Sequence, residues 1–320
     1  MPSYWIKLIL LCITLSLGVS AIHAGQFRIV SYNTENLFHP EHDSLKDDYE
    51  WTAEGERRWS YTRYYRKVEN IARVLTNIGE WEGADIIGLQ EVENASCLYQ
   101  LCRTLGRSEY AFVHYESPDR RGIDVALLYK KSRVDTLCTR AIKIDLGESS
   151  TRDILYVCAQ IDTGDTLHFL VCHLPSQRGG AAESAWKRAA AKERLQVAVD
   201  SLLLAQLHAR VIVMGDMNSS PKDDIRGLRN KMLPFAERGV GTHKYQGQWT
   251  CLDQFYTSEV LDSVAQVSIY DAQWIQESDE KYLGLRPKRT YLGFRYQNGF
   301  SDHLPIVMDI VLPNRTPHKQ

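Results

Sequence analysis

The sequence lacks an excess of charge of either sign. Its 38 Lys and Arg residues are balanced by 40 Asp and Glu residues, which gives a formal net charge of -2 at pH 7. A protein that binds nucleic acid over much of its surface usually carries a clear basic excess. The balance therefore excludes such a footprint, and any anion that this protein handles must be bound at a local site.

Cysteine is scarce as well, with seven residues in a chain of 320 and no Cys-x-x-Cys pair. This content excludes a small scaffold built on disulfides. Cys158 and Cys172 lie within apolar, strand-like stretches, where a buried free thiol is the ordinary outcome. We therefore expect the six cysteines that follow Cys12 to be free thiols, although export would permit disulfides.

Long apolar runs are missing beyond the N-terminus, so no later segment reaches the ~20 residues that a membrane-spanning helix needs. The N-terminal segment itself carries Lys7, an apolar run over residues 8–19, and small residues at Ala21 and Ala24. This pattern is typical of a signal peptide, and its apolar run is too short for a permanent membrane helix. We expect residues 1–24 to direct export to the periplasm or the exterior.

Internal repeats, low-complexity linkers and breaks in composition are also absent, while hydrophobic residues make up 44% of the chain, enough for a full core. A single domain over residues 25–313 is favoured, followed by a short tail at 314–320. Nothing in the sequence implies a stable protein partner, and we expect a monomer.

The apolar pattern predicts strands and helices that alternate irregularly. Residues 270–300 are polar and lack a clear period, which predicts a long surface loop facing the substrate. Pro221 is expected to open a charged helical turn. The pattern indicates an α/β fold whose mostly antiparallel sheets pack together with helices outside. The expected helices cover 64–78, 98–105 and 184–208, and the expected strands cover 27–33, 84–91, 110–115, 123–130, 134–144, 154–161, 167–173, 211–215, 251–257 and 305–311.

Polar residues that could take part in catalysis or binding lie at the ends of these predicted strands. Each has an ordinary explanation when taken alone: Asn33 would suit a turn, and Asp216 with Asn218 would cap the segment before Pro221. Function concentrates at such loop-bearing edges of a sheet, however, and it is the whole set that favours a site. The set comprises Asn33, Gln90, Glu91, His173, Asp216, Asn218, Asp253, Asp302 and His303.

Several acidic groups brought together repel one another unless a cation lies between them. Carboxylate and amide oxygens, without a cage of Cys or several His, indicate Mg²⁺, Mn²⁺ or Ca²⁺ rather than zinc. Histidines beside such an ion can donate hydrogen bonds to a phosphoryl oxygen, and a carboxylate can hold an imidazole in the useful tautomer. The residue types therefore favour phosphoryl chemistry.

In their order along the chain, these motifs resemble those of the endonuclease/exonuclease/phosphatase superfamily, the deoxyribonuclease-like metal-dependent phosphoesterases. The resemblance covers nearly all of the expected exported chain. Any one motif is weak, but six in sequence are hard to reach by chance. The motifs are Asn33, Gln90-Glu91, the segment 121–126 (Arg-Gly-Ile-Asp-Val-Ala), His173-Leu174-Pro175-Ser176, the segment 215–221 (Gly-Asp-Met-Asn-Ser-Ser-Pro) and Ser301-Asp302-His303-Leu304-Pro305.

The resemblance implies a four-layer α/β sandwich, in which two mixed sheets pack face to face with helices outside. It also implies a Mg²⁺ site, for which Mn²⁺ or Ca²⁺ could substitute, and in-line attack of water on phosphorus. By position, Asn33, Glu91 and Asp302 match the metal ligands, with Glu91 as the principal one. The matching catalytic residues are His173, Asp216, Asn218, Asp253 and His303.

Within that set, Asp216 matches the general base and Asn218 the residue that orients water and contacts the substrate. Asp253 matches the carboxylate that pairs with His303. Arg121 is a candidate phosphate contact, with a surface arginine as the equal alternative. Asp124 departs from the small or apolar residue usual at its position, and we interpret it as a partner for one of the site histidines.

The fold does not choose the substrate. An exported nuclease acting on DNA or RNA is favoured, because export fits an enzyme that scavenges phosphate or nucleotides. Cations and rings also mix over residues 57–67 as they would in a stacking groove. The alternative for that stretch is a helix start whose rings pack on the sheet. A phosphatase or phospholipase-type phosphodiesterase acting on lipid head groups or inositol phosphates is the second candidate, and a non-catalytic binding protein the third. Glycosylation at Asn218 would block the site, which favours a bacterial exported enzyme.

Overall fold

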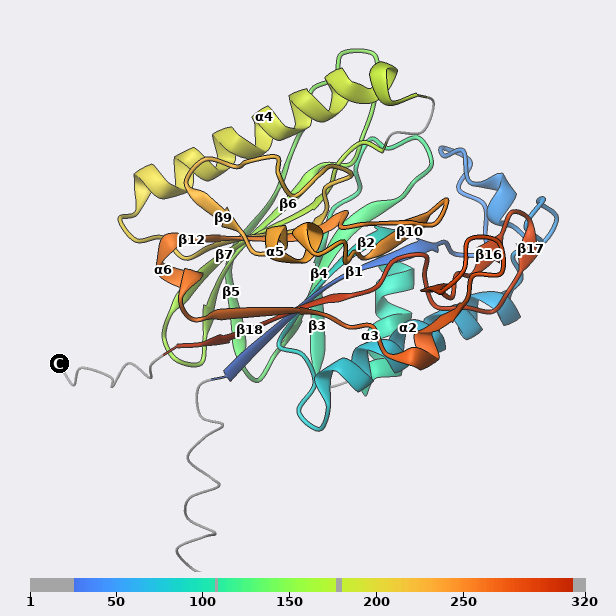
Figure 1. Ribbon diagram of the computed structural model, residues 1–320, viewed down its shortest axis with the longest axis horizontal. Helices are drawn as coiled ribbons and strands as arrows, with labels where there is room; N and C mark the ends of the chain where they lie inside the picture. Colours follow the sequence, from blue (N-terminus) through green and yellow to red (C-terminus); the bar gives the residue numbers. More distant parts are fainter. Residues whose placement is uncertain (1–25, 107–108, 177–179, 313–320) are drawn as a thin grey trace, which may run out of the picture.

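The computed structural model describes residues 26–106, 109–176 and 180–312 (Figure 1). The predicted signal peptide and the predicted C-terminal tail lie outside the described residues. Two large sheets of six strands each form the centre of the molecule. The first sheet has the order β13-β18-β1-β2-β4-β3, in which β1 and β2 are parallel and the other neighbours are antiparallel. Its strands are β1 (Gln26–Leu37), β2 (Ile86–Val92), β3 (Tyr110–His114), β4 (Asp124–Lys130), β13 (Ala265–Ile269) and β18 (Ile306–Val311).

The second sheet has the order β5-β6-β7-β8-β12-β9, in which only β7 and β8 run parallel. Both sheets are therefore mixed and mostly antiparallel, as predicted. The strands of the second sheet are β5 (Val134–Ile142), β6 (Ile154–Ile161), β7 (Thr166–His173), β8 (Val211–Asp216), β9 (Leu228–Asn230) and β12 (Asp253–Ser258).

The sheets pack face to face through a buried apolar layer. Ile29 and Met308 of the first sheet share one buried cluster with Phe169 and Met214 of the second. At Gly88 the absence of a side chain leaves room for Met214, whose Cε would lie 2.8 Å from an added Cβ. Burial of this apolar surface is the main force that holds the two sheets together.

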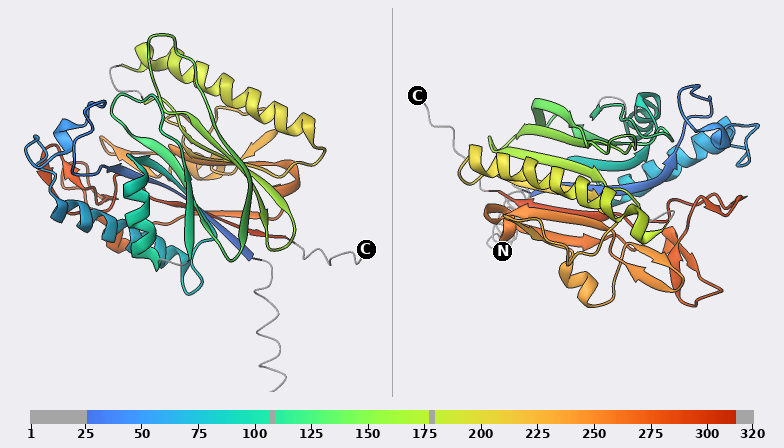
Figure 2. Two further views of the ribbon diagram at one scale, coloured as in Figure 1. Left: turned by 180° about the vertical axis from the view of Figure 1, so that it is seen from behind. Right: turned by 90° about the horizontal axis from the view of Figure 1, so that it is seen from above.

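Helices cover the outer faces of the two sheets (Figure 2). Helices α2 (Tyr61–Gly79) and α3 (Ala95–Gly106) pack on the first sheet, and α4 (Ala181–Ala205) lies over the second. Helix α2 begins where the Ser60 hydroxyl accepts a hydrogen bond from the Arg63 amide, and it buries the periodic residues Val68 and Ile71. The predicted four-layer α/β sandwich is confirmed.

Short elements complete the chain, and the sequence pattern did not predict them as such. They are the 3-10 turns η1 (Tyr49–Trp51) and η2 (Gln273–Ile275), helices α5 (Leu233–Glu237) and α6 (Glu259–Asp262), and the short strand pairs β10 (His243–Tyr245) with β11 (Gln248–Thr250), β14 (Gln276–Ser278) with β15 (Leu285–Pro287), and β16 (Tyr291–Leu292) with β17 (Arg295–Tyr296).

One local expectation was wrong, and another was incomplete. Pro221 opens a pair of turns that lead into β9, without helix, because the next residues pack against the sheet: Ile225 and Leu228 are buried in the cluster beneath α4. The segment 270–300 is not a bare surface loop, since it buries Thr290 and Tyr291. It lies beside the blue segment that contains η1, and the Tyr291 hydroxyl donates to the Arg57 carbonyl at 2.9 Å (Figures 1 and 2).

No helix among the described residues is long and apolar enough to cross a membrane. The six cysteines of the described residues are free thiols, and Cys158 and Cys172 are buried in one cluster beneath α4.

Candidate active site

Strand direction brings the predicted residues to one edge of the molecule. Parallel strands end at the same edge of a sheet, and an antiparallel neighbour begins there. His173, Asp216 and Asp253 accordingly lie side by side in register, at the ends of β7 and β8 and the start of β12. In the first sheet, Asn33 lies opposite Gln90, and the loop that contains Asp302 and His303 leads into β18 beside β1.

A hydrogen bond between the two sheets joins the halves of this edge. The Asn33 amide Nδ2 donates to Asp216 Oδ2 at 3.1 Å, and the Glu35 amide donates to Asn33 Oδ1 at 3.0 Å. Asn33 and Asp216 are both buried. The Asn33 side chain is thus fixed on both sides, and it holds the Asp216 carboxylate in one orientation.

The segment that follows β8 presents Asp216 and Asn218 together. The Asn218 amide donates to Asp216 Oδ1 at 2.9 Å, and its side chain donates to the Leu174 carbonyl at 3.1 Å. Gly215, directly before them, has φ +137, and an added Cβ would lie 1.9 Å from the Cys172 carbonyl oxygen. Only glycine permits this close approach of β7 and β8.

Burial raises the pKa of Asp216 to about 7, and the neighbouring His303 opposes this rise. A carboxylate with such a pKa can accept a proton near neutral pH, which suits a general base.

His303 and Asp253 form a buried ion pair. The Nδ1 of His303 lies 2.7 Å from Asp253 Oδ2, and Asp253 is fully buried at the start of β12. Burial alone would lower the pKa of His303, but Asp253, Asp216 and Asp302 outweigh it and raise that pKa well above the usual value. This shift favours the protonated imidazole, whose Nε2 faces the rest of the site, 3.9 Å from Asp216 Oδ2 and 4.0 Å from Asp302 Oδ1.

The second predicted histidine lies between the two sheets. Nε2 of His173 is 3.7 Å from Glu91 Oε1 and 3.6 Å from Asp216 Oδ2. It therefore stands between the predicted metal ligand and the predicted base, where an imidazole N–H could donate to a phosphoryl oxygen.

The proposed metal ligands fit a hard cation. Glu91 Oε2 accepts one hydrogen bond, from the Asn36 amide at 2.9 Å, and its other oxygen faces His173. The Asp302 carboxylate accepts no hydrogen bond from the residues that the structure describes. Despite burial, which acts in the opposite direction, the positive charge of His303 lowers the pKa of Asp302. Carboxylate oxygens without donors suit a divalent cation, whose other ligands would be water and phosphate oxygens.

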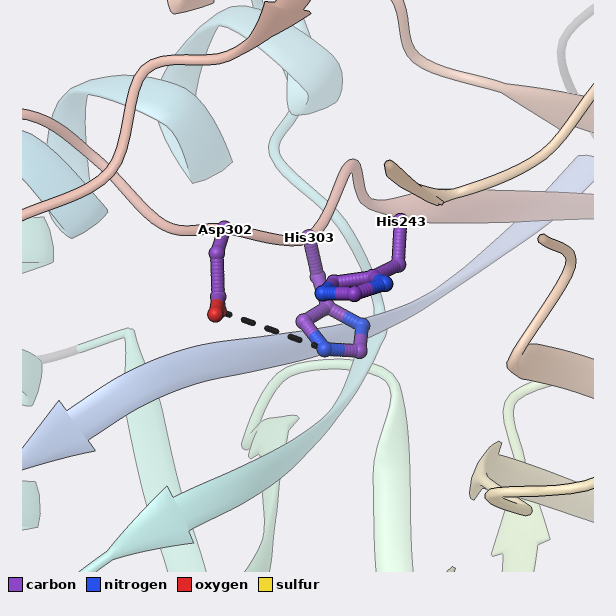
Figure 3. Close-up of side chains that lie close together, drawn as sticks. All are labelled: His243, Asp302 and His303. Atoms are coloured by element: carbon purple, nitrogen blue, oxygen red, sulfur yellow. Dashed lines mark ion pairs between the residues drawn. The ribbon is translucent and has the colours of Figure 1, made fainter. Parts of the chain in front are cut away.

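His243 also lies at the site, although the sequence pattern did not single it out. Its ring centroid is 4.9 Å from that of His303 with an angle of 39° between the rings, and the two histidines form a compact group with Asp302 (Figure 3). Burial lowers the pKa of His243 to about 4, and the positive charge of His303 contributes. His243 starts the short strand β10 rather than closing a long apolar strand, so no pattern marked it.

Arg289 is a second residue that the sequence pattern did not single out. It precedes the buried Thr290, and its charge is among the causes that lower the pKa of both Asp302 and His243. Its Nε is buried and has no hydrogen-bond partner among the described residues. A buried guanidinium nitrogen without a partner among the described residues is suited to an anionic ligand.

A buried ion pair fixes the segment that carries Arg289. Lys67 Nζ is fully buried, 3.8 Å from Glu35 Oε2, and it donates to Thr290 Oγ1 at 2.5 Å and to the Phe300 carbonyl at 2.7 Å. The Thr290 amide donates to Glu35 Oε2 at 2.5 Å. Lys67 was predicted to belong to a possible nucleic-acid groove, but its buried amine instead supports the segment around Thr290.

The other aromatic residues of the stretch 57–67 fall into a buried group and an exposed group. Trp59 and Tyr64 are buried and pack on the sheet, whereas Tyr61 and Tyr65 are exposed, with ring centroids 6.1 Å apart. The groove interpretation is therefore wrong for the buried residues of the stretch, whereas the two exposed rings and the exposed Arg58 and Arg66 are open to a ligand.

Two further predicted residues have local partners. Arg121 Nε lies 3.7 Å from Asp119 Oδ1, so its contact with substrate stays a prediction. Asp124 was expected to orient a site histidine; instead its Oδ2 is 3.2 Å from His114 Nε2, and Ser117 donates to its other oxygen. Asp124 is thus the partner of a histidine, but that histidine is His114 of the neighbouring strand β3, which is not among the predicted site residues.

Comparisons with known proteins agree with this geometry. A family model described as "Endonuclease/Exonuclease/phosphatase family" matches residues 28–311. No curated protein sequence matches the chain.

Solved structures share the fold at low sequence identity. A truncated TDP2 from Caenorhabditis elegans is similar with a TM-score of 0.60 and 18% identity, covering 90% of this chain and 98% of that one. The catalytic domain of human Nocturnin, with a bound sulfate anion, has a TM-score of 0.55 and 18% identity, with 89% and 93% covered. A mannosyl-6-phosphatase from Bacteroides thetaiotaomicron has a TM-score of 0.54 and 14% identity, with 89% and 100% covered.

The match of the family model to almost the whole described chain shows the family directly. Its members are metal-dependent phosphoesterases, and the carboxylates, amide and histidines gathered at the sheet edge are suited to that chemistry. The chain belongs to the endonuclease/exonuclease/phosphatase family.

Proposed function

We propose that this chain is an exported, Mg²⁺-dependent phosphodiesterase that cleaves nucleic acid by in-line attack of water. The single observation that carries the proposal is the meeting of the His303–Asp253 pair and Asp216 at one edge, with Glu91 and Asp302 beside them. A phosphodiester needs a water activated on one side of phosphorus and positive charge around its oxygens. The edge offers both.

The catalytic roles follow from the contacts. Asp216, with its raised pKa, takes the proton of the attacking water, and Asn218 helps to orient that water. The cationic His303, held by Asp253, donates from Nε2 to a phosphoryl oxygen, and His173 donates from its own side. Positioning and electrostatic stabilisation supply most of the rate in such reactions.

Glu91, Asp302 and the Asn33 amide oxygen would hold the Mg²⁺. The ion, when bound, supplies positive charge that neutralises the phosphoryl oxygens and lowers the repulsion among the acidic residues. Mn²⁺ or Ca²⁺ could occupy the same oxygen ligands.

The substrate assignment depends on residues outside the catalytic group. The positive charge of Arg289 acts on Asp302, and the Arg57 guanidinium lies 4.4 Å from the centre of the Trp51 ring. Exposed rings at Tyr61 and Tyr65 add surfaces on which bases could stack. A zebrafish TDP2 structure complexed with single-strand DNA product has a TM-score of 0.52, 18% identity, and covers 90% of this chain. We take single-stranded nucleic acid as the first substrate class.

A phosphatase is the second candidate. The buried, unpaired Nε of Arg289 favours it, because a phosphomonoester carries more negative charge than a diester and gains more from an added guanidinium. The Bacteroides thetaiotaomicron mannosyl-6-phosphatase has the same overall fold. Phospholipids and inositol phosphates are further substrates that this second candidate includes.

A hydrolysis panel tests the proposal. Purified protein is supplied with Mg²⁺, Mn²⁺ or EDTA and given single- and double-stranded DNA, RNA, inositol polyphosphates, sphingomyelin, a sugar phosphate and a chromogenic bis-ester. We expect cleavage of nucleic acid with Mg²⁺ and none with EDTA. Turnover of a monoester or lipid alone would replace the nuclease assignment, and no turnover of any substrate would favour a binding protein.

Export is tested separately. The full chain and a chain lacking residues 1–24 are expressed in a bacterium and assayed in periplasmic, medium and cytosolic fractions. We expect only the full chain to leave the cytosol and to appear shortened in mass. Retention of the full chain in the cytosol at full length would contradict the signal-peptide prediction.

A further inference from the structure

A pair of cysteines faces one another on β5 and β6 of the second sheet, two strands that carry none of the site residues. In the ladder between β5 and β6, Cys138 lies directly opposite Cys158. Two residues along, Arg140 lies opposite Tyr156, and its guanidinium is 4.9 Å from the centre of the Tyr156 ring. Because alternate residues of a strand share a face, the two thiols lie on the same face as this contacting pair.

The backbone geometry suits a disulfide. Side chains directly opposite in an antiparallel ladder have Cβ atoms about 4.5–5.5 Å apart, whereas a disulfide needs about 3.5–4.5 Å. The required approach is small, and β5 can supply it. It is the edge strand of its sheet, and its pairing with β6 is irregular between Thr136 and Cys138.

The two thiols differ in access. Cys138 is exposed, and Cys158 is buried beside Tyr156, whose hydroxyl lies 2.9 Å from His168 Nδ1. Burial raises the pKa of the Cys158 thiol, and the nearby Cys138 adds to the rise. An external oxidant therefore meets Cys138 first. Among the strand registers of the described residues, no other cysteine lies directly opposite a cysteine.

We propose that Cys138 and Cys158 are a modification site that forms an intramolecular disulfide with a low-molecular-weight disulfide as the oxidant. The Cys138 thiolate attacks one sulfur of the oxidant and releases one small thiol. Cys158 then gives up its proton and attacks Cys138 Sγ, which releases the second small thiol. Two protein thiols are oxidised, the oxidant is reduced to two thiols, and the two protons leave with them.

The bond would join the edge strand β5 covalently to β6. An edge strand is held by one neighbour only, so it separates more readily than a central strand. A cross-link there restricts the unfolded chain and opposes fraying of the edge. We expect the oxidised protein to melt at a higher temperature than the reduced protein.

Mass spectrometry of the folded protein tests the proposal without any use of activity. The folded protein is incubated with oxidised or reduced glutathione, then denatured and alkylated. We expect oxidation to protect two thiols, and peptide mapping to recover Cys138 joined to Cys158. The variant Cys138→Ser should lose the protection and the rise in melting temperature, whereas the matched variant Cys251→Ser, at a buried cysteine outside the pair, should keep both.

Several outcomes would overturn the inference. Full alkylation after oxidation would show that the thiols do not join. A lasting mixed disulfide between Cys138 and glutathione would show that Cys158 cannot reach it. A cross-linked peptide that contains any other pair would assign the site elsewhere.

Discussion

At the scale of single residues, the His303–Asp253 pair is the most constrained feature of the site. Its 2.7 Å contact is buried, and three carboxylates together raise the pKa of the imidazole. The pair gives the site a fixed cation that needs no reorganisation when a phosphoryl group arrives. Such preorganised charge is the main resource of a phosphoryl-transfer site.

Replacement of His303 should therefore remove most of the activity. We expect His303→Ala to lower kcat by about 10²–10⁴-fold, the usual contribution of a positioned acid or electrostatic group. The measurement is steady-state hydrolysis of the best substrate of the panel, with circular dichroism as the check on folding. His208→Ala, at an exposed histidine outside the site, is the control. Near-normal kcat in a folded His303→Ala protein would remove His303 from the mechanism.

Arg289 should affect substrate binding more than chemistry. We expect Arg289→Ala to raise KM by about 10-fold or more, since a hydrogen bond to a charged group contributes ~1.5–3 kcal/mol. Arg295→Ala, at an exposed arginine of the same loop, should leave KM unchanged. A loss of stability in Arg289→Ala with KM unchanged would instead make the arginine a structural residue.

The sequence identified much of the site because its residues close long apolar strands. Asn33 was predicted as the end of the first strand, but β1 runs on to Leu37. His173 and Asp216 could be located in this way, since they are the last residues of β7 and β8. His243 could not, because it starts a three-residue strand and reaches His303 only through the tertiary fold. The Lys67–Glu35 pair was hidden for a similar reason, since its partners are separated along the chain and join only when α2 packs on the first sheet.

At the scale of elements, the end of β8 depends on Gly215. Its positive φ and the 1.9 Å approach of the Cys172 carbonyl to an added Cβ leave no room for a side chain. We expect Gly215→Ala to lower the free energy of unfolding by ~2–5 kcal/mol, as for other severe local clashes. Urea unfolding measures this. Gly164→Ala also has positive φ, but nothing lies within 4 Å, so it should cost only ~1 kcal/mol.

Equal free energies of unfolding for Gly215→Ala and Gly164→Ala would contradict this account of the β7–β8 junction. If the account holds, the junction also explains why the chain places Asp216 directly after a glycine. The glycine lets the two parallel strands approach closely enough for His173 and Asp216 to lie in register.

His168, whose Nδ1 lies 2.9 Å from the Tyr156 hydroxyl, should make the stability of the protein depend on pH. Burial lowers the pKa of His168 below its usual value, so the unfolded chain binds a proton that the folded chain rejects as the pH falls below about 6.5. Stability should therefore be greater above that pH and decline below it. Urea midpoints compared at about pH 7.5 and about pH 5.5 should fall more for the natural protein than for His168→Gln. An equal fall in both would assign the pH dependence to other groups.

Elements were predictable where they were long and periodic. Helix α2 and the strands β1, β2 and β7 could be located from their apolar pattern, although α2 begins three residues before its first predicted residue. The sequence could not predict that the two hairpins belong to different sheets. Apolar and polar residues alternate in the same way in the β3–β4 hairpin as in the β5–β6 hairpin. Only tertiary packing separates them.

At the scale of the whole molecule, the acidic and basic residues are nearly equal in number but are not evenly distributed in space. The chain is nearly neutral, yet it gathers carboxylates at one sheet edge, where Asp216, Asp253 and Asp302 surround His303. Like charges at such a density oppose folding unless a cation joins them. The two-sheet fold is therefore expected to be more stable with the divalent ion than without it.

Metal binding should raise the melting temperature accordingly. We expect saturating Mg²⁺ to shift the thermal unfolding midpoint upward relative to EDTA, since a ligand bound only by the folded state stabilises it. In Glu91→Ala the shift should shrink or vanish, whereas Glu148→Ala, an exposed glutamate outside the site, should retain it. An equal shift in Glu91→Ala would place the ion elsewhere.

The most direct test of the central proposal is hydrolysis of single-stranded DNA by the natural protein and Glu91→Ala, with Mg²⁺ and with EDTA. We expect cleavage only by the natural protein with Mg²⁺, and a loss of orders of magnitude in Glu91→Ala although the variant stays folded. Cleavage that persists in EDTA, or that is equal in Glu91→Ala, would contradict a metal-dependent phosphodiesterase acting at this edge.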